Sequence, residues 1–209
     1  MSNGNSAERT AAQHEAKREL RKKIANRITL LSERERHDAA AFVASRVRSL
    51  DVWGEGCDLL VYLSMPDELS TVPVIAAARE DGLRVWAPRV TRADLRFYAI
   101  HRAGGSSLTR HPFGMDEPVA DGEGWKPPGA GDTGNKRTAI VLCPCRAVDP
   151  DGNRLGRGAG FYDRFLAESG TSVVSIALAW ECQVVPRVPT TAGDVAVAMI
   201  VTDRRIIVP

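Results

Sequence analysis

Residues 59–88 read LLVYLSMPDELSTVPVIAAAREDGLRVWAP, and the order of patterns in this stretch decides the fold class. Residues 59–63 form a short, continuous apolar run, which is typical of a strand buried on both faces. Residues 74–78 indicate a helix that ends near Gly82. Residues 83–86 then indicate a second strand, and a strand, a helix and a strand in this order predict a parallel sheet.

The rest of the chain continues this alternation. Apolar residues at four-residue spacing from Ala16 to Ile28 predict an amphipathic helix, and Ser32 with Glu35 forms the capping box of a second helix. Further strands are predicted over residues 95–100, 139–142, 173–179, 196–201 and 206–208, with a helix over 162–168. We therefore expect an α/β fold, in which a single domain holds one mixed, mainly parallel sheet flanked by helices on both faces.

Two stretches fall outside this pattern. Residues 1–14 are polar, and we expect a disordered N-terminal tail before a domain that spans residues 15–209. Residues 119–137 are dense in glycine, proline and aspartate without any periodicity, which predicts a long loop. The polar N-terminus also lacks the apolar core of a secretory signal, so we expect a cytoplasmic protein.

Composition excludes several classes of function. The net charge of +2 over 209 residues gives no global attraction to nucleic acid or to an anionic membrane, and no stretch approaches the roughly 18–20 apolar residues of a membrane span. The four cysteines and four histidines lack metal-ligand spacing, which argues against a zinc site. We interpret the cysteines as small buried hydrophobes. Any anion site must therefore be local.

The segment NRLGRGAGFYDR (residues 153–164) carries the strongest functional signal. Its alternate glycines let the backbone approach a ligand closely, and the start of the following helix presents unpaired N–H groups to an anion. Arg154 and Arg157 add positive charge, and we expect both side chains to project from a loop. A phosphate cradle is one interpretation; a tight turn from strand to helix, with its arginines in solvent, is the other. Phe161 takes the place of the last glycine of a dinucleotide-binding motif, so that motif does not fit.

The block from Asp149 to Arg164 resembles the signature of the 5-formyltetrahydrofolate cyclo-ligase family. Three further segments resemble the family in order and spacing: KRELR at residues 17–21, LSMPDELST at 63–71, and the stretch 181–194. The resemblance covers about residues 15–203. It implies that ATP, with magnesium, drives the cyclisation of 5-formyltetrahydrofolate to 5,10-methenyltetrahydrofolate and that ADP and phosphate are released.

The resemblance also implies roles for single residues. It implies ATP binding by Lys17, Arg18, Arg21, Arg154, Leu155, Gly156, Arg157, Gly158, Ala159, Gly160, Phe161 and Tyr162, with catalytic roles for Arg154, Arg157 and Tyr162. It implies folate binding by Leu63, Met65, Glu68, Phe113, Arg157, Gly158, Ala159, Gly160 and Phe161, although Phe113 fits a core position equally well. It implies magnesium binding by Asp163 and Asp194.

Physical arguments support several of these roles and leave alternatives open. Lys17 and Arg21 lie one helical turn apart, where like charges repel by roughly 0.2–0.5 kcal/mol unless an anion lies between them; the alternative is a solvated basic face. Glu68 could accept paired hydrogen bonds from the amino group and N3–H of a pterin, or favour the start of a helix. Asp163 and Asp194 could share one magnesium ion, or act as a helix cap and a surface residue.

Two departures from the family pattern motivate a different function. Residues 144–148 read PCRAV where the family often has a proline–glycine stretch, and Ala198 replaces a common second aspartate. The alternative is a non-catalytic or repurposed member that binds nucleotide or folate without turnover. A nucleic-acid-binding role for the basic N-terminal helix lacks both aromatic interleaving and excess charge. We expect a monomer whose partners are the small molecules ATP and reduced folate, with neither nucleic acid nor a membrane.

Overall fold

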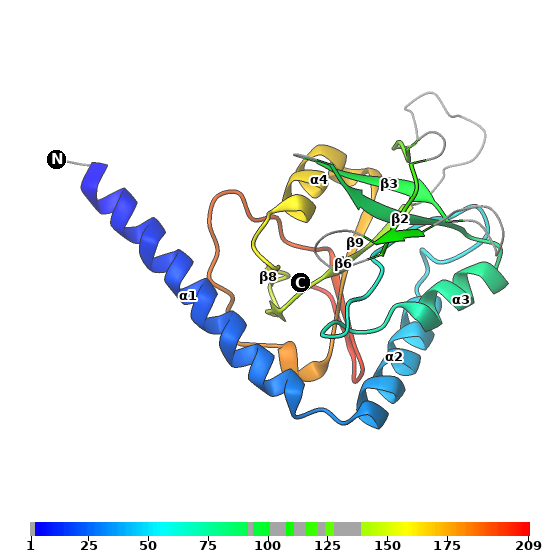
Figure 1. Cartoon of the computed structure of the whole chain (residues 1–209), viewed down its shortest axis with the longest axis horizontal. Helices are drawn as coiled ribbons and strands as arrows, with labels where there is room; N and C mark the ends of the chain where they lie inside the picture. The colour runs from blue at the N-terminus through cyan, green and yellow to red at the C-terminus, as the bar shows by residue number, and fades with distance from the viewer. Residues whose placement is uncertain (1–2, 92–93, 101–107, 111–115, 121–123, 128–138) are drawn as a thin grey trace.

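The computed structural model describes residues 3–91, 94–100, 108–110, 116–120, 124–127 and 139–209 (Figure 1). Its helices are α1 (Asn3–Thr29), α2 (Glu33–Arg48), α3 (Val72–Glu80) and α4 (Phe161–Ser169), with the 3-10 turns η1 (Gly170–Ser172) and η2 (Glu181–Gln183). Its strands are β1 (Asp58–Val61), β2 (Arg84–Val90), β3 (Leu95–Ala99), β4 (Leu108–Arg110), β5 (Asp116–Pro118), β6 (Ala139–Pro144), β7 (Ala147–Val148), β8 (Arg154–Leu155), β9 (Val174–Ala179), β10 (Met199–Thr202) and β11 (Ile206–Ile207).

One seven-stranded sheet organises the described residues, in the order β11-β10-β9-β6-β1-β2-β3. Neighbouring strands from β10 to β2 run parallel, whereas β3 and β11 pair antiparallel at the two edges. The sheet is therefore mixed and mainly parallel, as the sequence predicts. Two short antiparallel ribbons, β4 with β5 and β7 with β8, complete the strands.

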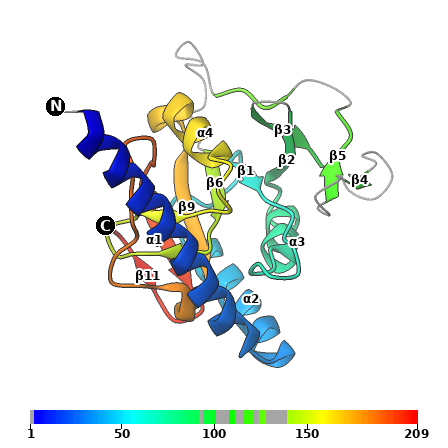
Figure 2. The ribbon, with the colours of Figure 1, turned by 60° about the vertical axis from the view of Figure 1, so that its left-hand side comes forward.

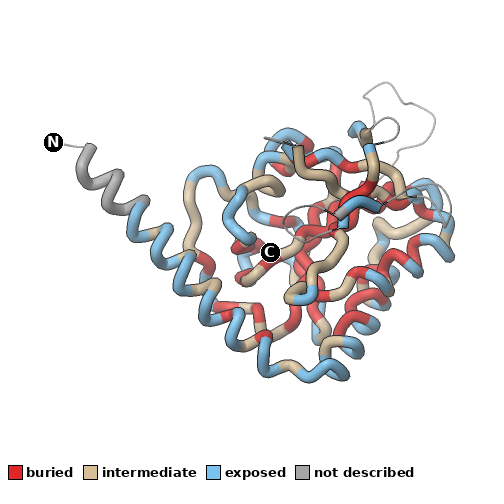
Figure 3. The backbone as a smooth tube through the Cα atoms, viewed as in Figure 1, coloured by how far each residue is buried: buried red, intermediate tan, exposed pale blue. Residues whose placement is uncertain are grey.

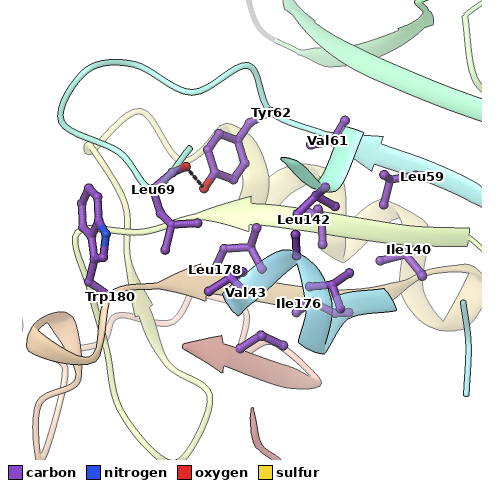
Figure 4. Packing of buried hydrophobic residues seen from close by; sticks show 14 of the residues in the cluster. Val43, Leu59, Val61, Tyr62, Leu69, Ile140, Leu142, Ile176, Leu178 and Trp180 are labelled. Carbon is purple, nitrogen blue, oxygen red and sulfur yellow. Dashed lines mark hydrogen bonds between the residues drawn. The ribbon is translucent and has the colours of Figure 1, made fainter. Parts of the chain in front are cut away.

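Alternation along the central strands divides the core between two faces. Leu142 and Ile176 belong to a cluster that also contains Val43 of α2 and Val74 of α3, and Figure 4 shows Val43 packed against this face. Val141 and Cys143, the neighbours of Leu142 in β6, belong to a second cluster, which contains Leu166 of α4. Helices therefore cover both faces of the sheet, and burying each large apolar side chain contributes about 1.5–3 kcal/mol. Figure 3 shows the buried residues gathered between these helices.

Helix α1 differs from the other helices because it contacts η2 and β7 and does not lie over the centre of the sheet. Its buried residues Ile24 and Ile28 join the cluster on the face of α2 and α3. Its N-terminal half extends beyond the sheet in both views (Figures 1 and 2). The helix begins at Asn3, within the stretch for which the sequence predicts a disordered tail.

The remaining expectations have mixed outcomes. Cys57, Cys143 and Cys145 are buried, Cys182 is partly buried, and all four are free thiols, as we interpret them from the sequence. Burial raises the pKa of Cys57 to about 11 and that of Cys145 to about 12. Within the described residues, no helix has the length and apolar character needed to cross a bilayer. Most of the predicted loop at 119–137 lies outside the described residues.

Candidate active site

The candidate site lies at the edge of the sheet where the parallel strands end, which is where open α/β folds collect ligand groups. Residues 62–71 leave β1 at this edge, the turn at Cys145 and Arg146 leaves β6, and η2 follows β9. The Tyr62 hydroxyl donates to the carbonyl of Leu69 at 3.0 Å (Figure 4), and the Thr71 hydroxyl donates to the carbonyl of Tyr62 at 2.8 Å. These bonds hold the segment that carries Glu68 in a fixed loop.

The glycine-rich segment turns directly from β8 into α4. Gly158 and Gly160 have φ values of 117° and 68°, a region that favours glycine, and Gly160 is the N-cap of α4. A Cβ atom added at Gly158 would lie 3.5 Å from Nη2 of Arg21. The glycines therefore do two things: they allow the tight turn, and they let α1 approach its backbone.

The two arginines of this segment lie in different surroundings. The side chain of Arg154 is 2% exposed, and its Nη1 donates to Oδ1 of Asp163 at 3.0 Å. The expectation that Arg154 projects from a loop is wrong, because β8 pairs with β7 and turns the side chain into the protein. Its Nε and Nη2 have no hydrogen-bond partner among the described residues. The side chain of Arg157 is 39% exposed, so this arginine is accessible.

Arg157 and Glu68 form an ion pair across the site. Nε of Arg157 donates to Oε1 of Glu68 at 2.9 Å, and the amide of Met65 donates to Oε2 of Glu68 at 3.0 Å. Arg157 also donates to Asp67, whose other oxygen accepts from Arg146. The segment predicted to bind folate and the segment predicted to bind phosphate are thus joined by salt bridges. Glu68 does not merely begin a helix, since α3 starts at Val72.

Helix α1 brings two of its predicted ATP-binding residues to this edge. Lys17 pairs with Asp194, and Nε of Arg21 donates to the carbonyl of Gly156 at 2.9 Å. Burial, and then repulsion by Arg146, lower the pKa of Arg21 below its usual value. The side chain of Arg18 is 64% exposed and pairs with Glu15 on the surface of the helix, so the structure does not bring it to the other cations. The alternative of a solvated basic face therefore describes Arg18 but not Lys17.

Tyr162 occupies an apolar position. Its ring meets Phe97 edge-on at 6.5 Å between centroids, and its buried hydroxyl has no hydrogen-bond partner among the described residues. Burial raises the pKa of this tyrosine well above its ordinary value, so the hydroxyl stays protonated at neutral pH. Tyr162 can therefore donate a proton in a hydrogen bond but cannot act as a base.

The two aspartates predicted to bind magnesium lie on segments that touch, Asp163 in the first turn of α4 and Asp194 in the loop before β10. The amide of Val195 donates to Oδ1 of Asp163 at 3.1 Å, next to Asp194 in the chain. Each carboxylate already pairs with a cation, Asp163 with Arg154 and Asp194 with Lys17. The described part of the chain contains no group of three or more residues suited to a metal ion. Two carboxylates still fit magnesium, because this ion is usually held by one or two of them together with substrate phosphates.

Other predicted residues have simpler outcomes. The side chain of Leu155 is buried, so only its backbone could reach a ligand, and its carbonyl already accepts from the amide of Arg146. Leu63 and Met65 are partly exposed beside Glu68. Phe113 lies outside the described residues. Sequence reasoning missed Asp67 and Arg146, although Arg146 stands in the stretch that departs from the family pattern.

Comparisons with known proteins relate nearly the whole chain to one enzyme family. The model of the 5-formyltetrahydrofolate cyclo-ligase family matches residues 13–203. Proteins named 5-formyltetrahydrofolate cyclo-ligase from Mycolicibacterium smegmatis and Mus musculus are 31% and 26% identical, over 73% and 87% of this chain and 77% and 91% of their own. The solved structure of Aquifex aeolicus 5,10-methenyltetrahydrofolate synthetase is similar with a TM-score of 0.72 and 27% identity, over 92% of each chain.

Proposed function

The chain belongs to the 5-formyltetrahydrofolate cyclo-ligase family, and we propose that it converts 5-formyltetrahydrofolate and ATP into 5,10-methenyltetrahydrofolate, ADP and phosphate. The observation that carries the proposal is the meeting of three distant segments at one sheet edge. Arg21 of α1 donates to the carbonyl of Gly156 in the glycine turn, and Arg157 of that turn pairs with Glu68. Lys17 of α1 pairs with Asp194. Cations and backbone N–H groups suit ATP phosphates, and a carboxylate suits a pterin.

The chemical difficulty of the reaction is that a formamide oxygen is a poor leaving group. Transfer of the γ-phosphoryl group of ATP to that oxygen breaks the bond to ADP and makes an activated imidate-like phosphate. N10 of the same folate then attacks the activated carbon and the five-membered ring closes. N10 loses its proton to solvent, and phosphate departs. The protein has to position the two substrates and neutralise charge, as in phosphoryl transfer generally.

We assign the positioning to residues at this edge. Glu68 would accept from the pterin, while Arg157 spans the gap between the folate and the phosphates and orients both. Lys17 and Arg21 of α1 would hold the phosphates. Nε and Nη2 of Arg154, which have no hydrogen-bond partner among the described residues, would stabilise negative charge on the phosphates. Tyr162 stays protonated, so its role is limited to hydrogen bonding and packing.

Magnesium fits the same arrangement through Asp163 and Asp194. When bound, it would neutralise charge on the phosphate oxygens. Lys17 and Arg154 would then exchange part of their contact with these carboxylates for contact with the phosphates. Substrate binding would therefore break part of both ion pairs, Lys17 with Asp194 and Arg154 with Asp163.

Two alternatives receive different support. A nucleic-acid-binding role is disfavoured, because the basic side chains of α1 are engaged: Arg27 donates to the carbonyl of Cys182 at 3.1 Å, and Lys22 pairs with Glu19. A family member without turnover is tested directly by activity. The stretch at 144–148 is held at the sheet edge by a hydrogen bond, in which the Arg146 carbonyl accepts from Nε2 of Gln183 at 3.1 Å.

One assay tests the proposed function. The purified protein is mixed with ATP, magnesium and 5-formyltetrahydrofolate, and the absorbance of the methenyl product is followed while each component is omitted in turn. We expect product only with all three. Arg48→Ala is the matched control variant, because Arg48 pairs with Glu80 and Asp81 on an exposed surface. Absence of turnover while ATP and folate still bind would establish the non-catalytic alternative.

A further inference from the structure

Asp67 lies between two arginines that come from different segments. One carboxylate oxygen accepts from Nη2 of Arg157, and the other accepts from Nη2 of Arg146. Nη1 of Arg146 also donates to the carbonyl of Asp67 at 3.1 Å. A single carboxylate thus fills the space between two guanidinium groups, each of which presents a fork of donors that matches an oxyanion.

Hydrogen bonds at both the amide and the carbonyl of Arg146 fix the position of its backbone. Its amide donates to the carbonyl of Leu155 at 2.6 Å, and its carbonyl accepts from Nε2 of the buried Gln183. The side chain of Arg146 is only 12% exposed, so its guanidinium has little freedom. A donor fork held in this way is preorganised for an anion.

A third arginine increases the positive charge near this position. Arg21 lies close enough for Arg146 to lower its pKa, after the larger effect of burial. Only Nε of Arg21 has a hydrogen-bond partner among the described residues, the carbonyl of Gly156. Like charges are tolerated better when an anion lies between them. Asp67 is the carboxylate that pairs with both Arg146 and Arg157, while Glu68 pairs with Arg157 alone.

Asp67 is also the carboxylate that can leave most easily. Its side chain is 49% exposed, whereas that of Glu68 is 9% exposed and is bonded to the amide of Met65. Rotation of the Asp67 side chain toward solvent would therefore free Nη2 of Arg146 and Nη2 of Arg157 without disturbing Glu68. Solvation of the released carboxylate limits the free-energy cost of this rotation.

We propose that Arg146 and Arg157 form a site for an oxyanion group of the substrates, and that Asp67 competes with that group by filling the site itself. The inference rests on the proposed function, because that function supplies polyanionic substrates. The oxyanion is a phosphate of ATP or a carboxylate of the glutamate tail of a folate. Arg146 is thereby a binding residue, and Asp67 sets how tightly the site holds its ligand.

Isothermal titration with inorganic tripolyphosphate tests the competition in the parent, Asp67→Asn, Arg146→Gln and the double variant. Asp67→Asn keeps the shape of the side chain but removes its charge. We expect it to tighten binding about tenfold, the change that follows if Asp67 fills the site about 90% of the time. Arg146→Gln should weaken binding, and in the double variant the gain should vanish because the fork itself is missing.

Asp81→Asn is the matched control, because Asp81 also accepts from an arginine, Arg48, and its replacement changes the net charge equally. Binding of tripolyphosphate to this variant should equal that of the parent. A second series with γ-linked triglutamate identifies the source: a gain for tripolyphosphate assigns a phosphate, and a gain for triglutamate assigns the folate tail.

Two results would overturn the proposal. If Asp67→Asn tightens neither ligand, Asp67 is not a competitor. If the gain persists when Arg146 is replaced, it comes from charge at a distance and not from this site. These titrations need no turnover, so their failure is separate from failure of the omission assay. Urea unfolding of each variant confirms that a loss of binding is not a loss of fold.

Discussion

Arg154 and Arg157 stand three positions apart, yet replacing them should lower the free energy of unfolding by different amounts. Arg154→Ala leaves the largely buried Asp163 without its cation, and we expect the free energy of unfolding to fall by about 3–5 kcal/mol. Arg157 is far more exposed, so Arg157→Ala should change the free energy of unfolding by only about 1 kcal/mol. Urea unfolding monitored by circular dichroism measures both.

The activity of the Arg157 variant tests its proposed contact with the substrates. Arg157→Ala removes a charge-assisted contact to substrate, so kcat/KM should fall by the equivalent of about 1.5–3 kcal/mol while the protein stays folded. Arg157→Lys should keep only part of the kcat/KM of the parent, because lysine lacks the planar fork of donors. Equal destabilisation by Arg154→Ala and Arg157→Ala would contradict the difference in burial.

Glu68 allows folate recognition to be separated from nucleotide binding. Glu68→Gln keeps the size of the side chain but sets an amide N–H against a donor, either the pterin or the amide of Met65. An unsatisfied buried donor costs about 1–3 kcal/mol, so folate affinity should fall about tenfold or more while ATP affinity barely moves. Isothermal titration with each ligand measures this. Equal weakening of both would indicate a folding defect.

Local patterns together with the family resemblance singled out Gly158, Gly160 and Glu68, because a glycine turn and the end of a buried strand are short-range signals. The burial of Arg154 was not predictable, since β8 has two residues and shows no alternation. The pairing of Asp67 with Arg146 was missed because it joins positions 79 residues apart. Such contacts depend on the tertiary fold.

Helix α4 carries Asp163, and the loop with Asp194 is tied to α1 through Lys17. Asp163→Asn and Asp194→Asn should each raise the magnesium concentration needed for half-maximal activity, because an amide keeps the shape but loses the charge that holds a hard cation. Magnesium titrations of initial rate measure the effect, with Asp38→Asn on the exposed face of α2 as the control. Overlaid titration curves for both variants and the parent would mean that neither aspartate is a ligand.

The order of the main elements follows from the sequence, whereas their limits do not. Continuous apolar runs predict β1, β6 and β9, because strands buried on both faces have a strong pattern. The start of α1 at Asn3 was missed because polarity was taken as disorder, although alanine, glutamate and arginine in residues 7–12 also favour a helix. The β7–β8 ribbon is too short for any periodic signal.

At the scale of the whole molecule, acid should weaken the fold through the carboxylates of the site. Burial alone would raise the pKa of Asp67 and of Asp194, but hydrogen bonds from Arg146 and Arg157, and from Lys17 and Thr191, hold each pKa below its usual value. A lowered folded pKa contributes stability above the unfolded value of 3.8, and that stability is lost as the pH falls through the folded pKa.

The double variant Asp67→Asn/Asp194→Asn should therefore lose stability less steeply than the parent between about pH 5 and pH 2. Both side chains are partly exposed, so solvent screening keeps the difference modest. Urea unfolding at a series of pH values measures it, with the exposed turn residue Asp51 replaced by asparagine as the control. An identical pH profile in the parent and the double variant would show that these ion pairs do not contribute.

The salt bridge between Lys17 and Asp194 joins positions 177 residues apart, and this separation bears on how the protein is synthesised. The ribosome makes α1 first, but its docking partners β7, η2 and Asp194 belong to the last third of the chain. A nascent polypeptide therefore carries α1 with Ile24 and Ile28 uncovered until translation is nearly finished. Closure of α1 onto the body, and with it assembly of the cations proposed to bind phosphate, waits for the final segments to emerge.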